Sequence, residues 1–512
     1  MKEEQTSKYW LDLTAADIIK KHPKGEIIVA SGISPSASYH VGHFREVLTA
    51  DALAWAIRKA GREAKHLHFS DNFDPLRRRY EFLPEEFEKY VGWPICLIPD
   101  PFGDCHSNYA KHYYAEFEES ASRMGVEMYP IFSYEDQYQV GKMTPYIEKT
   151  LEHIDEIREV FERVSGRKLD ADWTPVQVIN PVTNNFFNAS LKTWDKAKQT
   201  IEGVDYTSGN AKLNWRLDWP SRWHLWSVDV EPFGRELATK GSSYDTGKEF
   251  VKLFGGEAPY PVPYDTINLV GETKKMSSSL GNLVTPDEAL SVMPAEVLRY
   301  FVVRSKPDRT LVFDSGLGLY NLIEEYSKIE SALERGEDHE FKEAYELART
   351  GSKDRVISSV PFSHLVAVYQ AAQGEFGEMV AILERTGYEE AVKKEADVLR
   401  KEADYVKNWL AKYAPESVKF AVQKKLPKVE LSGEQKTFLA ELADGIEAEK
   451  GLSGQGMHDL VYAKAEKAGL RPPQAFVAIY RVVLAKDSGP KAGWFLASLD
   501  TSWLIHRLRL QA

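Results

Sequence analysis

The sequence predicts an α/β protein in which a domain built on a parallel sheet is followed by an all-α domain. A short β-branched run, 27–30, is followed by a turn of small residues and then by a helical pattern that begins at Phe44. A second strand-like run, 65–70, leads directly into two aspartates, and ligands bind at such strand ends in open parallel sheets. After about residue 320, strand-like runs give way to apolar residues at helical spacing.

Length and composition are those of a globular protein with several domains. A chain of 512 residues is long for one core and indicates about three domains. No run is long and apolar enough to cross a bilayer, and the first residues lack the apolar core of a signal peptide, so we expect a cytoplasmic protein without membrane association. The net charge of -12 is a weak guide to partners, because a phosphate backbone is bound by a local basic face.

The two cysteines, Cys96 and Cys105, are too few for a disulfide framework or a four-cysteine zinc site. Cys105, His106 and His112 are close enough in sequence to suggest a metal cluster. We expect them instead to be separate buried or surface side chains, so the sequence predicts no metal site.

The expected elements of the first domain are a helix over 10–21, the strand 27–30, the helix from Phe44, the strand 65–70, a helix over 146–164 and a strand over 266–270. Small residues that include Gly32, Ser34 and Pro35 separate the first strand from its helix. They leave backbone N–H groups open to a ligand, and the N-terminus of the next helix attracts phosphate. This arrangement indicates a Rossmann-like nucleotide-binding domain.

Two histidines flank a glycine where this helix begins. His40 and His43 can both face a phosphate that rests against the bare backbone of Gly42. The sequence HVGH resembles the HIGH motif of enzymes that join a carboxylate to the α-phosphate of ATP, in which imidazole donors stabilise the charge that develops as pyrophosphate leaves. The alternative is a pair of helix-capping or surface histidines.

A second motif follows the strand over 266–270. The stretch KKMSSSLGN, 274–282, resembles the KMSKS loop that closes over the triphosphate in class I aminoacyl-tRNA synthetases. The alternative, a solvated turn, is disfavoured because both motifs occur in the expected order. The expected ATP ligands are Pro35, Gly42, His43, Lys274, Lys275, Met276, Ser277 and Ser278.

Longer passages resemble one family, the class I lysyl-tRNA synthetases: SDNFDPLRRRY, PICLIPDPFG and YAKHYYAEFEESASRMG within 70–125, then LDWPSRW, VEPFG and GSSYDTG within 217–247. The likeness covers most of 8–320 and returns at 476–499. It implies lysine activation by ATP with accompanying Mg²⁺, followed by transfer to tRNA(Lys). His40, His43 and Lys275 are then catalytic, and Gly32 and Ser34 hold the amino-acid end. We expect a monomer.

The family walls its lysine pocket with a tryptophan and a histidine, which correspond here to Trp215 and Leu237, so the second position departs from the pattern. The family's HIGN is HVGH here, and the lysine that usually follows the serines is Leu280. Lysine specificity needs a carboxylate that reaches the ε-ammonium. Four residues could supply it, and the sequence does not choose among them: Asp71, Asp74, Glu231 and Glu236. Asp71 and Asp74 could equally cap the turn that follows them.

The expected domain borders are 1–320 for the catalytic domain, with an insertion at about 166–214, and 321–512 for a helical domain. The resemblance implies that the helical domain binds the anticodon. In many relatives the insertion binds zinc through cysteine pairs, which are absent here, so we expect no structural zinc. Ordinary packing should hold it together, through Val176, Val178, Ile179, Phe186, Phe187 and Trp194.

Three other functions fit the motifs less fully. One is a class I synthetase for another amino acid, such as glutamate or arginine. A small-molecule nucleotidyltransferase would need no large helical domain. A catalytically weak paralogue would bind tRNA but would not activate lysine.

Overall fold

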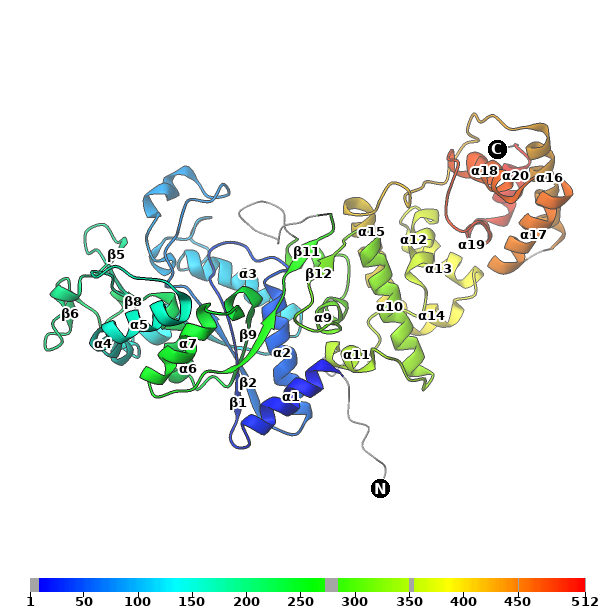
Figure 1. Cartoon of the computed structure of the whole chain (residues 1–512). Helices are drawn as coiled ribbons and strands as arrows, with labels where there is room; N and C mark the ends of the chain where they lie inside the picture. The colour runs from blue at the N-terminus through cyan, green and yellow to red at the C-terminus, as the bar shows by residue number, and fades with distance from the viewer. Residues whose placement is uncertain (1–8, 272–283, 350–353, 450, 512) are drawn as a thin grey trace, which may run out of the picture. The chain divides into compact units, whose positions relative to one another are not determined.

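The computed structural model describes residues 9–271, 284–349, 354–449 and 451–511 (Figure 1). Its main sheet has five strands in the order β10-β9-β1-β2-β3, and every neighbouring pair is parallel. They are β1 (Ile27–Ile33), β2 (Ala64–Ser70), β3 (Tyr129–Phe132), β9 (Val230–Gly234) and β10 (Tyr260–Tyr264). The strand order reverses between β1 and β9, which makes this the topological switch point where ligands bind in open α/β sheets. The predicted Rossmann-like α/β class is confirmed.

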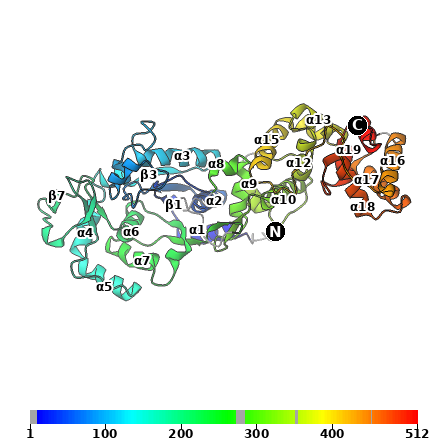
Figure 2. The ribbon, with the colours of Figure 1, turned by 90° about the horizontal axis from the view of Figure 1, so that it is seen from above.

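Helices cover both faces of this sheet (Figure 2). Side chains alternate between the two faces of a strand. On β2, Phe69 packs with Trp219 and Val251 from α6 (Trp215–Leu225) and α7 (Ser243–Leu253). His68 faces the other way and stacks on Phe117 of α3 (Tyr109–Arg123) at 4.7 Å between ring centroids.

The first helices occur where the sequence predicts them: α1 spans Trp10–Lys21 and α2 spans Phe44–Lys59. Leu53 and Ile57 of α2 are buried together with its main apolar stripe, because the helix is enclosed on more than one side. β1 runs three residues beyond the predicted strand, so that Gly32 pairs with Phe69 of β2 and lies in the strand rather than in the turn.

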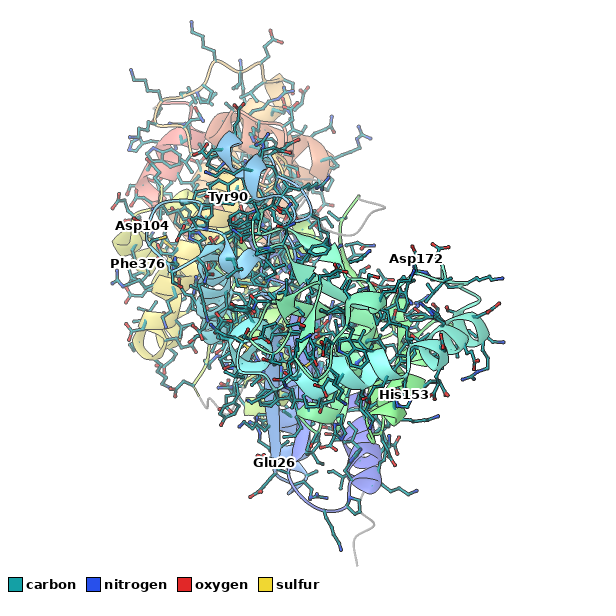
Figure 3. The ribbon with its side chains drawn as sticks, turned by 90° about the vertical axis from the view of Figure 1, so that its left-hand side faces the viewer. Glu26, Tyr90, Asp104, His153, Asp172 and Phe376 are labelled. Carbon is teal, nitrogen blue, oxygen red and sulfur yellow. The ribbon has the colours of Figure 1, made fainter. Side chains whose placement is uncertain are left out.

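The predicted single helix over 146–164 is wrong: there are two helices, α4 (Thr144–Glu152) and α5 (Ile154–Ser165), which break at His153. The apolar stripes of the two halves enter different clusters. Residues of α4 pack with the insertion, whereas residues of α5 pack with α6 and α7. A break lets each half bury its own stripe, and the His153 side chain at the junction remains exposed (Figure 3).

The insertion forms a three-stranded antiparallel sheet of β4 (Val176–Ile179), β5 (Phe186–Asn188) and β8 (Ala211–Leu213), with a hairpin of β6 (Thr200–Ile201) and β7 (Val204–Asp205). The six residues predicted to hold it together all pack in one hydrophobic cluster, with Val176, Val178 and Ile179 buried.

The chain forms two compact units. The first comprises Met1–Ala289, Leu298–Phe313 and Glu343–Gly351; it also contains the parallel pair β11 (Ile267–Leu269) and β12 (Leu311–Phe313). The second comprises Leu290–Val297, Asp314–Lys342 and Ser352–Ala512, and its described regular elements are helices. No described helix has both the length and the apolar composition needed to cross a membrane. The remaining helices are α8 (Pro286–Leu290), α9 (Ala295–Val303), α10 (Leu317–Glu334), α11 (Lys342–Ala348), α12 (Phe362–Ala371), α13 (Phe376–Arg385), α14 (Glu389–Lys394), α15 (Ala396–Lys412), α16 (Gly433–Ala448), α17 (Gly454–Lys467), α18 (Pro472–Leu484), α19 (Ala492–Ser498) and α20 (Thr501–Leu508).

Candidate active site

The two predicted histidines lie together between the end of β1 and the start of α2. The rings of His40 and His43 stack with centroids 3.7 Å apart. The backbone N–H of His40 donates to Nδ1 of His43 at 3.2 Å, so the neutral His43 ring carries its own proton on Nε2. The Tyr39 ring packs edge-on against His43 at 5.3 Å. The turn therefore places imidazole groups at a helix N-terminus, where backbone amides favour phosphate.

The chain returns to this turn after the second motif. The backbone N–H of Val41 donates to the carbonyl of Val284 at 2.9 Å. The expected ATP ligands Lys274, Lys275, Met276, Ser277 and Ser278 lie outside the described residues, as does Leu280. The segment that follows the KMSKS-like stretch thus contacts the HxGH turn.

A carboxyl group that the sequence interpretation missed lies beside the predicted amino-acid site. Glu46, in the first turn of α2, accepts the backbone N–H of Gly32 at 2.7 Å and the hydroxyl of Tyr264 at 2.6 Å. Burial raises the pKa of Glu46 to about 8. Within the described part of the chain, no basic side chain forms an ion pair with it. The sequence did offer a signal for Glu46, which lies three residues after the HVGH motif, in the first turn of the helix that follows it.

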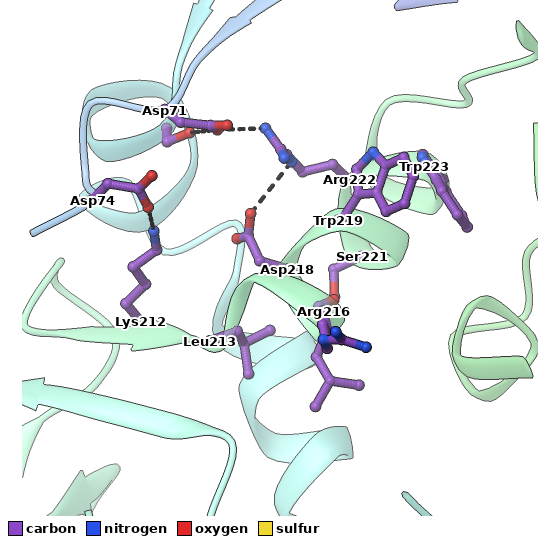
Figure 4. Close-up of polar contacts among 12 residues, drawn as sticks. Asp71, Asp74, Lys212, Leu213, Arg216, Asp218, Trp219, Ser221, Arg222 and Trp223 are labelled. Carbon is purple, nitrogen blue, oxygen red and sulfur yellow. Dashed lines mark hydrogen bonds and ion pairs between the residues drawn. The ribbon is translucent and has the colours of Figure 1, made fainter. Parts of the chain in front are cut away.

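The two aspartates that follow β2 are paired with cations of the chain itself (Figure 4). Asp71 accepts hydrogen bonds from Arg222 at 2.6 Å and from the Ser133 hydroxyl at 3.1 Å. Asp74 forms an ion pair with Lys212 from β8 of the insertion. Burial alone would lower the pKa of Lys212, but Asp74 raises it above its usual value, so that the ammonium stays charged. Asp71 and Asp74 stay candidates for the carboxylate that binds a substrate cation, and each of them already has a cation of the chain as a partner.

A third acid extends this network. Asp218 contacts Arg222 at 3.3 Å and accepts the Tyr138 hydroxyl at 2.5 Å. The same hydroxyl accepts the backbone N–H of Leu213 at 3.1 Å. The strand ends of the sheet and the insertion are therefore joined through buried polar groups.

The tryptophans of α6 surround another carboxylate. Trp215 begins the helix and is 43% exposed, whereas Trp219 and Trp223 are buried and donate their indole N–H groups to Glu231 at 3.0 and 2.6 Å. Burial raises the pKa of Glu231. Leu237 packs against the cluster that contains Trp219 and Trp223, so it contributes an apolar surface near this carboxylate.

The remaining predicted residues lie around the same strand ends. The Ser34 hydroxyl contacts the Asp71 carbonyl at 3.4 Å, Pro35 is buried in the turn, and Glu236 is exposed just beyond β9. Carboxyl groups outnumber cations among the described side chains named above. The cations are Lys212 and Arg222, and the carboxyl groups are those of Glu46, Asp71, Asp74, Asp218 and Glu231. This excess of acid favours a cationic substrate.

A different cluster corrects the expectation that Cys105, His106 and His112 are separate side chains. Together with Asp100 they place four potential ligand atoms within 4.8 Å of one another. The segment 100–112, a loop and the first turn of α3, brings them together, and the spacing D-x4-CH-x5-H was the sequence signal for the cluster.

Comparison with known proteins gives the same family as the motifs. Residues 8–351 match the sequence model of "tRNA synthetases class I (K)". A lysine–tRNA ligase from Methanosarcina barkeri is 38% identical, covering 98% of this chain and 97% of that protein; one from Archaeoglobus fulgidus is 38% identical, covering 98% and 99%. A solved glutamate-tRNA synthetase from Elizabethkingia anophelis, 12% identical, covers 95% of this chain and 100% of its own with a TM-score of 0.46. The predicted resemblance is confirmed: the chain belongs to the class I lysyl-tRNA synthetase family.

Proposed function

We propose that this chain is a lysine–tRNA ligase that activates lysine with ATP and transfers it to tRNA(Lys). The lysine carboxylate attacks the α-phosphorus of ATP, the bond to the β-phosphate breaks, and pyrophosphate leaves. The terminal ribose of tRNA then takes the lysyl group from the adenylate. The supporting observation is that the HxGH turn lies at the switch point of the sheet, beside a pocket rich in carboxyl groups, in a chain similar over its full length to proteins named lysine–tRNA ligase.

In this proposal the HxGH turn and the KMSKS-like loop bind the phosphates of ATP. His40 and His43 donate to the oxygens on which charge develops, and the backbone of Gly42 lets the phosphates approach. Pro35 shapes the turn, while Lys274, Lys275, Met276, Ser277 and Ser278 close over the triphosphate. Mg²⁺ accompanies ATP, whose phosphate oxygens are its natural ligands.

The lysine end of the reaction depends on a carboxylate that the described part of the chain does not pair with a cation. Asp71 and Asp74 are each paired with a cation, whereas the donors to Glu46 are the neutral groups of Gly32 and Tyr264. We assign the substrate ε-ammonium to Glu46. Glu46 retains some solvent contact, so a ligand can reach it. Asp71 and Asp74, each paired with a cation of the chain, hold the pocket in shape.

The rest of the pocket fits the aliphatic part of lysine. An indole such as Trp215 can cover a methylene chain, and Leu237 supplies an apolar wall in place of the family's histidine. Gly32 and Ser34 hold the α-carbon end. A glutamate substrate would meet like charges in this acidic pocket, which disfavours that alternative.

The helical region 321–512 serves as the anticodon-binding domain in this proposal, and residues 1–320 carry catalysis. We further propose that the enzyme acts as a monomer in the cytoplasm. Size-exclusion chromatography with light scattering tests the monomer, and truncation after residue 320 should abolish tRNA binding.

The decisive experiment is ATP–pyrophosphate exchange with each of the twenty amino acids, with and without total tRNA. Exchange should occur with lysine alone. Exchange with another amino acid would overturn the pocket assignment, and tRNA binding without any exchange would indicate the inactive paralogue. His40→Ala should lower the exchange rate by an amount that corresponds to a loss of about 2–4 kcal/mol in transition-state stabilisation. An unchanged rate would refute the role of His40.

A further inference from the structure

We propose that Arg45 is a positioning residue for lysine recognition, which fixes the backbone beside Tyr264 and thereby the hydrogen bond that Tyr264 donates to Glu46. Arg45 is the second residue of α2 and directly precedes Glu46. No step of the chemistry described above uses its side chain. The proposal rests on the proposed function, because it gives Arg45 a role in the site assigned to the substrate ammonium.

The Arg45 side chain is fully buried, and its two Nη atoms donate to backbone carbonyl groups. Nη1 donates to the carbonyl of Val302 at 2.7 Å, near the C-terminal end of α9. Nη2 donates to the carbonyls of Lys306 and Pro307 at 3.1 and 3.0 Å and lies 3.4 Å from that of Arg309. One side chain of α2 thus holds the end of α9 and the turn 304–310 that follows it.

Stability alone gives little reason for this arginine. Burial lowers the pKa of Arg45 to about 10, because the charged guanidinium loses its hydration. Its described hydrogen-bond partners are all carbonyl groups, and its Nε lies buried without a partner among the described residues. A buried charge that no opposite charge contacts usually lowers the stability of a fold. We therefore assign to Arg45 the position of the turn 304–310.

The turn 304–310 in its turn fixes the end of β10. The carbonyl of Pro307 accepts the backbone N–H of Asp265 at 2.8 Å in addition to the Arg45 guanidinium. The Asp265 carboxylate accepts the hydroxyl of Thr310 at 2.8 Å, so both its backbone and its side chain are tied to this turn. Asp265 directly follows Tyr264, the last residue of β10. The position of Tyr264 therefore depends on a turn that Arg45 holds.

Two neighbouring residues of α2 thus reach the same end of β10 by different routes. Glu46 reaches it directly, because its carboxyl group accepts the Tyr264 hydroxyl at 2.6 Å. Arg45 reaches it through the turn 304–310 and Asp265. A binding site is precise only when the residues around it hold its side chains in one geometry. A shift of the turn would move the Tyr264 hydroxyl and, with it, the carboxyl oxygens that face the ammonium in the proposed binding mode.

The first test compares Arg45→Lys with Arg299→Lys in pyrophosphate exchange by the full-length chain, with total tRNA present. A lysine keeps the charge but lacks the planar fork that donates to several carbonyls at once. The KM for lysine should rise about fivefold in Arg45→Lys, the effect of one weakened hydrogen bond, while the KM for ATP stays unchanged. Arg299 is a matched control, since it is also buried but donates to Asp51 and to the carbonyl of Met124 at 2.7 and 3.1 Å. Arg299→Lys should lower the melting temperature and leave the KM for lysine unchanged.

The second test examines the route through Tyr264. In a Tyr264→Phe background, Arg45→Lys should raise the KM for lysine no further, because the hydroxyl through which the turn acts is gone. Arg45→Gln, which also keeps N–H donors for the carbonyls, takes the place of Arg45→Lys if that variant does not fold.

Three results would contradict the positioning role and leave the proposed function standing. They are an unchanged KM for lysine in the folded Arg45 variant, an equal rise in Arg299→Lys, and effects of Arg45→Lys and Tyr264→Phe that simply multiply. Absence of lysine-dependent exchange in the unmodified chain would instead refute the proposed function, and the role of Arg45 with it.

Discussion

Replacement of Glu46 by glutamine tests how the enzyme recognises lysine. The glutamine side chain keeps a carbonyl oxygen for the N–H of Gly32, and the Tyr264 hydroxyl can rotate to accept from the new amide, so the pocket should keep its shape. In the proposed binding mode, the variant loses the charged partner of the substrate ammonium. A hydrogen bond between charged groups contributes about 1.5–3 kcal/mol, so kcat/KM for lysine should fall about 10- to 150-fold.

The assay compares lysine with norleucine, which has the same length but lacks the ε-amino group. Pyrophosphate exchange is measured with both amino acids for the parent enzyme, for Glu46→Gln and for Glu236→Gln, whose carboxyl is exposed near the same strand ends. Only Glu46→Gln should lose selectivity for lysine. An equal loss with lysine and norleucine would show that Glu46 holds the α-amino group or the pocket shape, and a loss confined to Glu236→Gln would move the assignment there.

Three further outcomes follow from the charges. The KM for lysine should fall as the pH rises toward about 8, because burial raises the pKa of Glu46 to that value and only its ionised form attracts the ammonium; a flat KM profile would contradict this. Burial likewise raises the pKa of Glu402 in the helical unit to about 8, so its stabilising contribution is present below its ordinary pKa near 4.5 and is lost as the pH rises through 8. Urea unfolding of Glu402→Gln should show a flatter dependence on pH in that window than the parent does. Lys212→Met should lower the free energy of unfolding by about 3 kcal/mol, because Asp74 is left buried without its cation. The double variant Lys212→Met with Asp74→Asn should recover part of that loss. Thermal unfolding measures both, and a Lys212→Met variant as stable as the parent would refute the pairing.

The fold was predictable because its signals are local. The β-branched run at 27–30, the helical stripe from Phe44 and the small residues between them lie in one continuous passage. The helix over 146–164 misled for the opposite reason: its stripe is continuous in sequence, but its halves pack against different partners. A helix break that is caused by packing against distant segments does not change the local spacing of apolar residues, so the sequence pattern cannot reveal it.

From the sequence, residues of the candidate site could be predicted only where they belong to a recognisable motif. His40 and His43 come from one motif, and the structure stacks their rings. The pairing of Asp74 with Lys212 joins residues 138 positions apart, which no spacing rule reveals. The cluster of Asp100, Cys105, His106 and His112 is an intermediate case, because its residues are near in sequence but come together only when the loop folds back on α3.

The acids of the pocket divide by the kind of partner that each one has. Where the chain supplies a cation, as Arg222 does for Asp71, the carboxylate is neutralised and mainly stabilises the fold. Where the chain supplies neutral hydrogen-bond donors, as for Glu46 and Glu231, the carboxyl group can still form an ion pair with a positively charged ligand. In the proposed binding mode the ε-ammonium of lysine is that positive charge. An apolar residue such as Leu237 is compatible with this proposal because it would contact only the methylene chain.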